Sequence, residues 1–465
     1  CPMIKTRWAV KACSLALCLC LAGCSTAPDI PQPTLDELLA EVNAEHQKIE
    51  TPHIDRASYL RDAPDKATVE KYRLEDVQDC DLNAEITAAR AAEDVEYLFG
   101  AFQALYGPYT YLGGDEVFNA HKADILARCT EQDSWTVQDF RDMMAEELAF
   151  LPDAHFNLHN RRTQPSQVPF FFRQTAFYKT GTGYQTAAGQ TVQSVDGYPE
   201  LDKLMKRSIS PEGELVYYPV LLQPRELSTE EQICDETLTV RYTDGSSEHL
   251  AAEPFRFYGL YGYEKGDPEL PVTDLHETRG IPVAALNACN TNSMDEILRS
   301  ASALKNAPIA ILDLSQNFGG NSLAGDQWLQ EYCGQQVPNN MVSFRVFGSR
   351  VSAPSRDKWV ANDNILIVLT GKLTASAAED LVDKAYNLEN VLFIGENTGG
   401  YLLTSASNEI QLPNSHLRIV MGDSLLCLTA SREEGGHEFE GYYPDIWVPA
   451  DEAEELAAKL IERLL

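Results

Sequence analysis

The stretch LTASAAED, Leu373–Asp380, contains the serine with the strongest case for chemistry. Ser376 precedes Glu379 by three residues, and this spacing is typical of a capping box that satisfies the first free amides of a helix. The same place, between the apolar run ILIVLT and the helix, offers free N–H groups and a partial positive charge to an oxyanion. The stretch therefore predicts a helix that begins here. It leaves open whether Ser376 only caps that helix or is also a nucleophile.

Three further short motifs surround this stretch in the C-terminal half of the chain. The first is ILDLSQNFGGN, residues 311–321, an apolar strand that ends in a Gly-Gly turn. Glycines in such a turn let backbone amides approach a ligand closely. The others are GENTGGY, residues 395–401, which follows the apolar run VLFI, and HEFEGYYPDIWV, residues 437–448.

Together the four motifs resemble the C-terminal half of the family S41 serine peptidases. That family includes the tail-specific proteases, the tricorn core protease and the modules of interphotoreceptor retinoid-binding protein. The matching segments are Asp313–Gly320, Thr374–Glu379, Gly395–Gly399 and Gly441–Asp445. The resemblance covers residues 85–450 and implies an α/β fold. This fold would be a ClpP/crotonase-like spiral of ββα units, joined to an N-terminal helical unit and a β-rich, PDZ-like domain.

A serine hydroxyl is a weak nucleophile and needs a base beside it. One branch of the family supplies a lysine after GExTxG, but Tyr401 occupies that position here. The tricorn-like branch supplies a histidine in an LxDxH pattern and a glutamate shortly before GxxPD. The resemblance then implies Ser376 as nucleophile, His155 as general base and acid, and Glu438 as the residue that orients the histidine. Glu440 is the neighbouring alternative to Glu438.

Two more features of the site follow from the resemblance. The N–H groups of Ala377 and of Gly319 or Gly320 would hold the oxyanion. The family's usual arginine is replaced by Ser315, which leaves open a member that binds peptides or apolar ligands without cutting them.

A metal site on His155 and the nearby His159 is disfavoured. The chain has no HExxH pattern and no third ligand follows this pair. The sequence therefore predicts neither a metal nor a cofactor.

The hydrophobic pattern predicts the elements that must position these residues. Residues 25–78 form a tether and linker with one amphipathic helix, LDELLAEVNAEH. Residues 79–162 form the helical domain, residues 163–265 alternate apolar and polar residues as a β-rich domain does, and residues 266–465 form the peptidase core.

Length and charge limit the class of protein. The 465 residues are too many for one ordinary core, and the formal charge of −33 excludes a nucleic-acid partner. Beyond Cys24, the cysteines form no CxxC pair, so a zinc or thioredoxin-type site is disfavoured. Disulfides and buried free thiols both remain open, and Cys80–Cys129 is the most plausible pair if a disulfide exists.

The first residues have the layout of an export signal. Lys5, Arg7 and Lys11 precede a short apolar segment that ends in Leu21–Cys24 and resembles a bacterial lipobox. The sequence predicts a signal peptide at residues 1–24 and lipidation of Cys24. An ordinary signal peptide that contains cysteines is the alternative.

The combined prediction is an exported serine peptidase, anchored by lipid to a cell-envelope membrane and facing outside the cytoplasm. Its substrates would be peptides or unfolded proteins. Two alternatives remain: an inactive binding protein of the same fold, and an esterase or amidase that uses the same triad.

Overall fold

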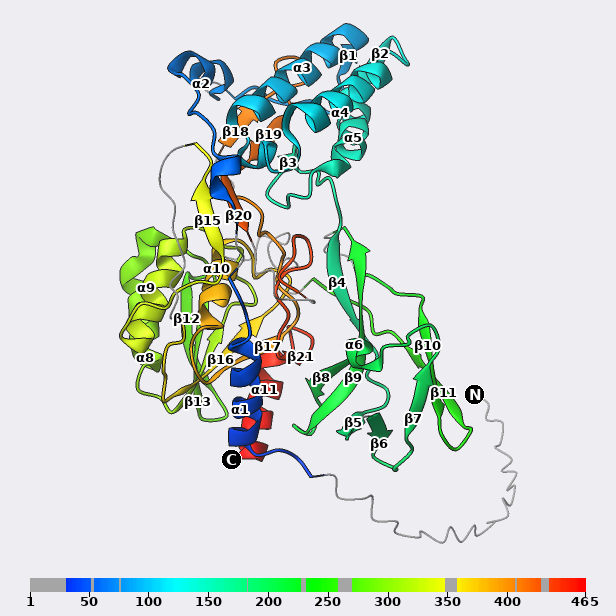
Figure 1. The fold of residues 1–465 in the computed structure, drawn as a ribbon, viewed down its shortest axis with the longest axis vertical. Coiled ribbons are helices and arrows are strands. Elements are labelled where there is room, and N and C mark those ends of the chain that lie inside the picture. Colours follow the sequence, from blue (N-terminus) through cyan, green and yellow to red (C-terminus); the bar gives the residue numbers. More distant parts are fainter. Residues whose placement is uncertain are drawn as a thin grey trace, which may run out of the picture.

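The computed structural model describes residues 31–465, except 52–53, 75–76, 182, 227–230, 258–269, 348–357, 406–407 and 428–434. The predicted signal peptide and Cys24 lie outside the described residues. Figure 1 shows a helical unit at one end, an α/β core, and a β-rich unit beside that core. Within the described ranges, no helix is both long and apolar enough to cross a membrane.

The core is built on a six-stranded sheet with the order β12-β13-β14-β16-β17-β21. Only β12 runs antiparallel to its neighbour, and the remaining neighbours are parallel. The strands are β12 (Thr273–Thr278), β13 (Ile281–Leu286), β14 (Ile309–Asp313), β16 (Ile365–Thr370), β17 (Val391–Gly395) and β21 (Ile446–Trp447). This arrangement confirms the α/β prediction.

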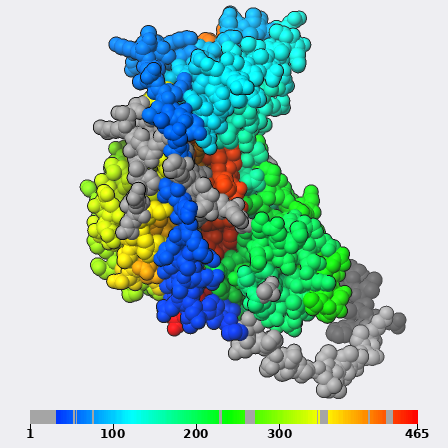
Figure 2. Space-filling model, viewed as in Figure 1, coloured from blue at the N-terminus to red at the C-terminus, as the bar shows by residue number. Residues whose placement is uncertain are grey.

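Helices cover both faces of this sheet. Apolar residues of α8 (Met294–Leu304), α9 (Ser322–Cys333) and α10 (Ala377–Ala385) pack with one set of strand residues, such as Leu312. Apolar residues of α1 (Leu35–His46) and α11 (Ala453–Leu464) pack with the other set, such as Ile311. Figure 2 shows the blue segment that contains α1 on the outside of the core. Burial on both faces explains why the four inner strands β13, β14, β16 and β17 are continuous apolar runs in the sequence, whereas the edge strand β12 is exposed and polar.

The helical unit contains α3 (Ala88–Leu105), α4 (Gly114–Cys129) and α5 (Val137–Glu147), as predicted for this region. Two strands from the C-terminal half of the chain, β18 (Asn408–Gln411) and β19 (Arg418–Met421), belong to it as well. β19 pairs with β3 (Asn157–Leu158), and Ile410 and Ile419 join the apolar core of the helices. The segment that carries His155 is therefore held between the two halves of the chain.

The remaining elements complete the fold. Beside the helical unit lie β1 (Glu85–Thr87), β2 (Ser134–Thr136), α2 (Lys66–Tyr72) and three short 3-10 helices, Arg56–Tyr59, Gly107–Tyr109 and Leu148–Phe150. A fourth 3-10 helix, Thr291–Ser293, precedes α8. β15 (Val342–Arg345) and β20 (Ser424–Cys427) pair at the edge of the core.

The β-rich unit consists of two sheets, with the orders β4-β9-β5-β6 and β11-β10-β7, and β8 also pairs with β9. Its elements are β4 (Ser166–Phe171), β5 (Phe177–Thr180), β6 (Gly183–Thr186), β7 (Val192–Val195), α6 (Leu201–Leu204), β8 (Met205–Ile209), β9 (Leu215–Arg225), β10 (Thr237–Tyr242) and β11 (Ser247–Ala251). Ser208 Oγ donates a hydrogen bond to the Trp447 carbonyl at 2.6 Å, which ties this unit to the last strand of the core. Its PDZ-like character and its boundaries stay predictions.

Cys80 and Cys129 are free thiols. Cys129 is buried in the helical core, whereas Cys80 Sγ donates to the Ser415 carbonyl at 3.5 Å. Cys234, Cys289 and Cys333 are free as well. The preferred disulfide is therefore absent, and the alternative of free thiols describes these five residues.

Candidate active site

Ser376 lies in the turn between β16 and α10. Its φ of 56° and ψ of −116° lie outside the regions that residues with a side chain normally adopt, so the turn holds it under strain. The turn is fixed on the Gly-Gly segment, because Thr374 Oγ1 donates to the Leu314 carbonyl at 2.8 Å and Ala375 N–H donates to the Asn317 carbonyl at 3.0 Å. These contacts keep the serine at the first turn of the helix.

Glu379 stabilises this turn with its buried carboxylate. Its Oε2 accepts the N–H groups of Ser376 and Tyr401, each at 2.9 Å. Its Oε1 accepts the Gly400 N–H at 2.8 Å and the Thr398 hydroxyl at 2.5 Å. Burial raises the pKa of Glu379 to about 7. The glutamate of the predicted capping box therefore also joins the serine turn to the GENTGGY segment.

His155 and Ser376 are brought together as predicted. His155 Nε2 lies 2.9 Å from Ser376 Oγ, although 221 positions separate them in the sequence. The imidazole is only 8% exposed, and this burial together with the charge of Arg162 lowers the pKa of His155 to about 4. At neutral pH the ring is therefore uncharged, and its Nε2 is free to accept the serine proton if Nδ1 carries the ring hydrogen. Nδ1 is buried and has no hydrogen-bond partner among the described residues.

Glu438 lies beside the histidine segment but does not bind the imidazole. One carboxylate oxygen accepts the Ala154 N–H at 2.6 Å, and the other accepts the N–H groups of Leu402 and Leu403 at 2.6 and 2.7 Å. Glu438 therefore fixes the backbone next to His155 and joins it to the segment after GENTGGY. The predicted orienting role of Glu438 stays a prediction, and any such effect would have to act through the main chain, because these three donors occupy both of its oxygens.

Asp153 is a site residue that the sequence reasoning did not single out. Its carboxylate accepts the His155 N–H at 3.0 Å, the Tyr106 hydroxyl at 2.8 Å and the Thr404 hydroxyl at 2.9 Å. Burial raises the pKa of Asp153 to about 6. Burial and then the charge of Asp153 raise the pKa of Glu438. The signal that could have singled out Asp153 is its place two residues before the histidine in the LxDxH pattern.

Glu440 does not take the place of Glu438. Its side chain accepts the Gly435 N–H at 3.0 Å, and its backbone carbonyl accepts the side-chain amide of Asn397. Within the described residues it has no contact with His155.

The three predicted oxyanion donors are not equivalent. Gly319 N–H donates to Asn317 Oδ1 at 2.9 Å and is therefore engaged. The N–H groups of Gly320 and Ala377 have no acceptor in the part of the chain that the structure describes. A Cβ on Gly319 would lie 2.9 Å from Ser376 Cβ, so this position must be glycine for the two segments to meet. Gly320 and Ala377 are the available donors.

Tyr401 stands where the sequence resemblance would place a lysine, and it contributes its ring. The ring centroids of Tyr401 and His155 are 5.2 Å apart, and the guanidinium of Arg162 lies 4.8 Å from the Tyr401 centroid. Lys372 is buried, and its ammonium donates to the Thr398 carbonyl. Burial lowers the pKa of Lys372 to about 7.

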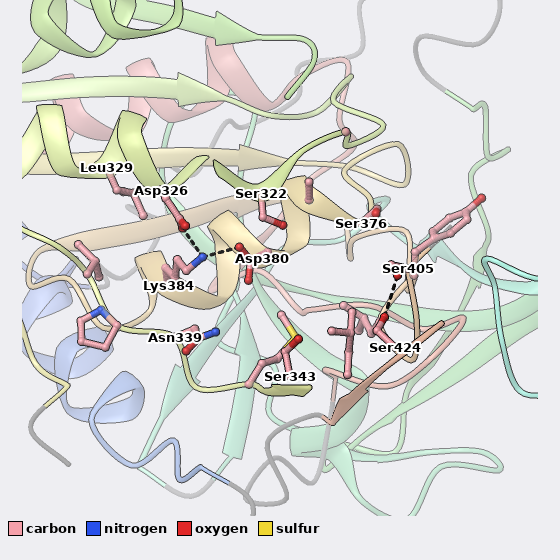
Figure 3. A pocket seen from close by; sticks show the side chains of 18 of the residues that line it. Ser322, Asp326, Leu329, Asn339, Ser343, Ser376, Asp380, Lys384, Ser405 and Ser424 are labelled. Carbon is pink, nitrogen blue, oxygen red and sulfur yellow. Dashed lines mark hydrogen bonds and ion pairs between the residues drawn. The ribbon is translucent and has the colours of Figure 1, made fainter. Parts of the chain in front are cut away.

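A cavity of about 680 Å³ opens beside Ser376 (Figure 3). Gly320, Ser376 and Ala377 line one end of it, and it extends along α9 and α10 to β20. Among the described residues, no group of three or more His, Cys, Asp or Glu side chains is placed to hold a metal ion.

Comparison with known proteins identifies the part of the chain that carries these motifs. Residues 281–446 match the model of Peptidase family S41. No curated protein matches the chain. Three similar solved structures are mature CPAF complexed with lactacystin, the photosystem II D1 C-terminal processing protease, and the tricorn protease.

All three are distant in sequence. CPAF is 13% identical, with a TM-score of 0.40, over 81% of this chain and 97% of CPAF. The D1 protease is 13% identical, with a TM-score of 0.39, over 80% of this chain and 97% of that protein. Tricorn is 13% identical, with a TM-score of 0.38, over 81% of this chain and 37% of tricorn.

Proposed function

The chain carries a peptidase family S41 domain, and we propose that it hydrolyses peptide bonds with Ser376 as nucleophile and His155 as general base. The observation that carries this proposal is the 2.9 Å contact between His155 Nε2 and Ser376 Oγ. It is supported by the strained backbone of Ser376, since nucleophiles held at such turns present the hydroxyl away from the helix.

The reaction follows from this contact. As Ser376 Oγ attacks the substrate carbonyl, His155 Nε2 takes its proton, and the N–H groups of Ala377 and Gly320 donate hydrogen bonds to the carbonyl oxygen as negative charge develops on it. The protonated imidazole then gives its proton to the leaving amine. A water molecule then attacks the acyl carbonyl and loses a proton to the same nitrogen. The imidazole returns this proton to Ser376 Oγ as the bond between the acyl group and the serine breaks.

Glu438 and Asp153 act as positioning residues in this proposal. They hold the backbone N–H groups of Ala154 and His155, at 2.6 and 3.0 Å, and so fix the imidazole relative to the serine. A displacement of about 1 Å in such an arrangement is enough to cost a hundredfold in rate.

A fluorophosphonate probe tests the catalytic pair, because it labels only an activated serine. Residues 25–465 of the wild type are expected to be labelled, whereas Ser376→Ala and His155→Ala are not. Ser322→Ala removes another serine from the wall of the same cavity, and His159→Ala removes another histidine of the same segment; both are expected to retain labelling. Equal labelling of wild type and Ser376→Ala would refute the assignment of the nucleophile.

We also propose that the protein is exported and anchored by a lipid on Cys24, on the evidence of the signal-like residues 1–24. Cells that express the full chain are grown with a radioactive or alkyne fatty acid. The expected result is incorporation into the wild type and none into Cys24→Ala. Equal incorporation into both proteins would contradict the anchor.

A further inference from the structure

The cavity beside Ser376 has walls of two kinds. One part is apolar and is formed by Leu329, Val337, Met341, Leu402 and Leu426. The other part is charged and is formed by Asp326, Asp380, Asp423 and Lys384. These four are the only charged groups among the described lining residues, and three aspartates with one lysine leave a formal charge of −2.

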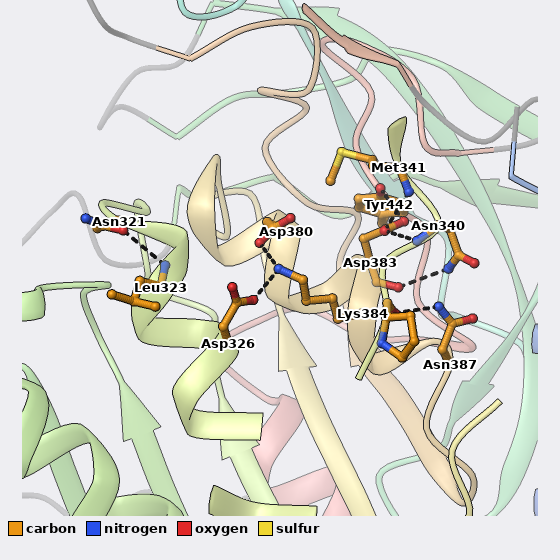
Figure 4. Close-up of polar contacts among 11 residues, drawn as sticks. Asn321, Leu323, Asp326, Asn340, Met341, Asp380, Asp383, Lys384, Asn387 and Tyr442 are labelled. Carbon is orange, nitrogen blue, oxygen red and sulfur yellow. Dashed lines mark hydrogen bonds and ion pairs between the residues drawn. The ribbon is translucent and has the colours of Figure 1, made fainter. Parts of the chain in front are cut away.

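The cavity wall holds three aspartates and one lysine, and two of the aspartates share that lysine. Lys384 donates to both Asp326 and Asp380, as Figures 3 and 4 show. A bound anion would have to displace one of these carboxylates from the ammonium. A cation meets no such obstacle, because the Asp326 side chain is 44% exposed and can accept further hydrogen bonds.

The apolar wall is held in place by buried contacts. Asp383 accepts the backbone N–H groups of Asn340 and Met341 at 2.6 and 3.0 Å, and its other oxygen accepts the Tyr442 hydroxyl at 2.9 Å (Figure 4). These contacts fix the backbone of Met341 against α10. This part of the apolar wall is therefore set by the fold itself.

The charged end lies within reach of a substrate side chain. Asp380 follows Ser376 by four residues at the start of α10, which corresponds to a rise of about 6 Å along a helix. The side chain next to the attacked carbonyl would enter the cavity at Ser376. A lysine or arginine has an apolar stem that suits the apolar wall and a charged head that reaches the aspartates.

We propose that this cavity binds the side chain of the residue whose carbonyl Ser376 attacks, and that it selects lysine or arginine there. The inference rests on the proposed peptidase function and specifies its substrate class. A neutral substrate side chain would form no ion pair with the carboxylates of Asp326 and Asp380, and an acidic side chain would be repelled by them.

The test uses fluorogenic peptides that differ only at that residue, with arginine, its neutral isostere citrulline, norleucine or glutamate. We expect kcat/KM for the arginine peptide to exceed that for the citrulline peptide by roughly tenfold, which is the effect of one hydrogen bond between charged groups. The glutamate peptide should have the lowest kcat/KM. In Asp326→Asn the arginine-to-citrulline ratio is expected to fall by roughly fivefold. A partly unfolded preparation does not change this ratio, because both peptides meet the same active fraction.

Glu331→Gln is the matched control. It removes one negative charge from the same helix, but its carboxylate faces Ser302 and Lys305 outside the cavity. The ratio should not change in this variant. Asp423→Asn is a second test variant, at the third aspartate of the cavity wall, and the ratio is expected to fall there too.

An arginine-to-citrulline ratio near one, or a ratio that Asp326→Asn and Asp423→Asn leave unchanged, would overturn the proposal. A preference for glutamate would also overturn it. The fluorophosphonate probe separates these results from a failure of the catalytic proposal: an unlabelled Ser376 refutes catalysis, whereas a labelled enzyme without arginine preference refutes only the selectivity.

Discussion

The low pKa of His155 predicts that the catalytic pair works in mildly acidic solution. Burial, and secondly the charge of Arg162, lower this pKa from 6.5 to about 4. The imidazole must be neutral to take the serine proton, so activity is lost only as the pH falls through the lowered pKa. The perturbation to apply is a change from pH 7.5 to pH 5.0.

The magnitude follows from the fraction of neutral imidazole. With a pKa of about 4, about 90% of the rings are neutral at pH 5.0, so the labelling rate should change by about 10%. With the ordinary pKa of a solvated histidine, only about 3% would be neutral, and the rate would fall about 30-fold. The two cases are easily distinguished.

The assay is the second-order rate of labelling by an uncharged fluorophosphonate across this pH range, with circular dichroism to verify the fold at each pH. His155→Ala supplies the background rate. A fall of about 30-fold in the labelling rate at pH 5.0, with the protein still folded, would refute the conclusion that burial lowers the pKa of His155. A fall with its midpoint near 6 that disappears in Asp153→Asn would assign the titration to Asp153, whose pKa is raised to about 6.

Three further predictions concern the packing around the serine turn. Gly319→Ala should abolish labelling and lower the free energy of unfolding by about 1–3 kcal/mol, because φ is +97° and the new Cβ would lie 2.7 Å from the Ala375 carbonyl oxygen. Gly189→Ala is the control: its φ is +83° but its Cβ would point into open space, so this variant should keep labelling. Glu379→Gln should lower the free energy of unfolding in urea by about 1–3 kcal/mol, because an amide nitrogen replaces one of the two oxygens that accept buried hydrogen bonds. An unchanged midpoint of urea unfolding would contradict this. Burial raises the pKa of Glu396 to about 7. As the pH rises from 4.5 to 8, the free energy of unfolding of the wild type should therefore fall by up to about 3 kcal/mol relative to that of Glu396→Gln. A difference between the two proteins that does not change with pH would refute the shift.

The sequence predicted the elements whose residues repeat with a clear period. The helix expected at LDELLAEVNAEH is α1, and the apolar run ILIVLT is β16. Local spacing suffices for such elements, because their burial depends on one face or on a continuous run. It also located the start of α10 after Ser376.

The site required more than local spacing. His155 could be joined to Ser376 only through the family resemblance, since no periodicity links residues so far apart. The contacts of Glu438 with backbone N–H groups, and the role of Asp153, depend on main-chain positions that no side-chain pattern encodes. The pairing of β19 with β3 was likewise invisible, because a four-residue strand carries too little signal to name a distant partner.

This pairing has a consequence for how the protein is made. The apolar core of the helical unit is incomplete until β18 and β19, at residues 408–421, have left the ribosome. Until then the helices expose the surface that these strands will cover, and the segment before β3 has no strand to pair with. A growing chain therefore passes through a long interval in which His155 is already synthesised but the segment that carries it is not yet held in place by β19. The topology therefore delays the assembly of the proposed catalytic site until residue 421 has emerged, when most of the preceding elements have had time to fold.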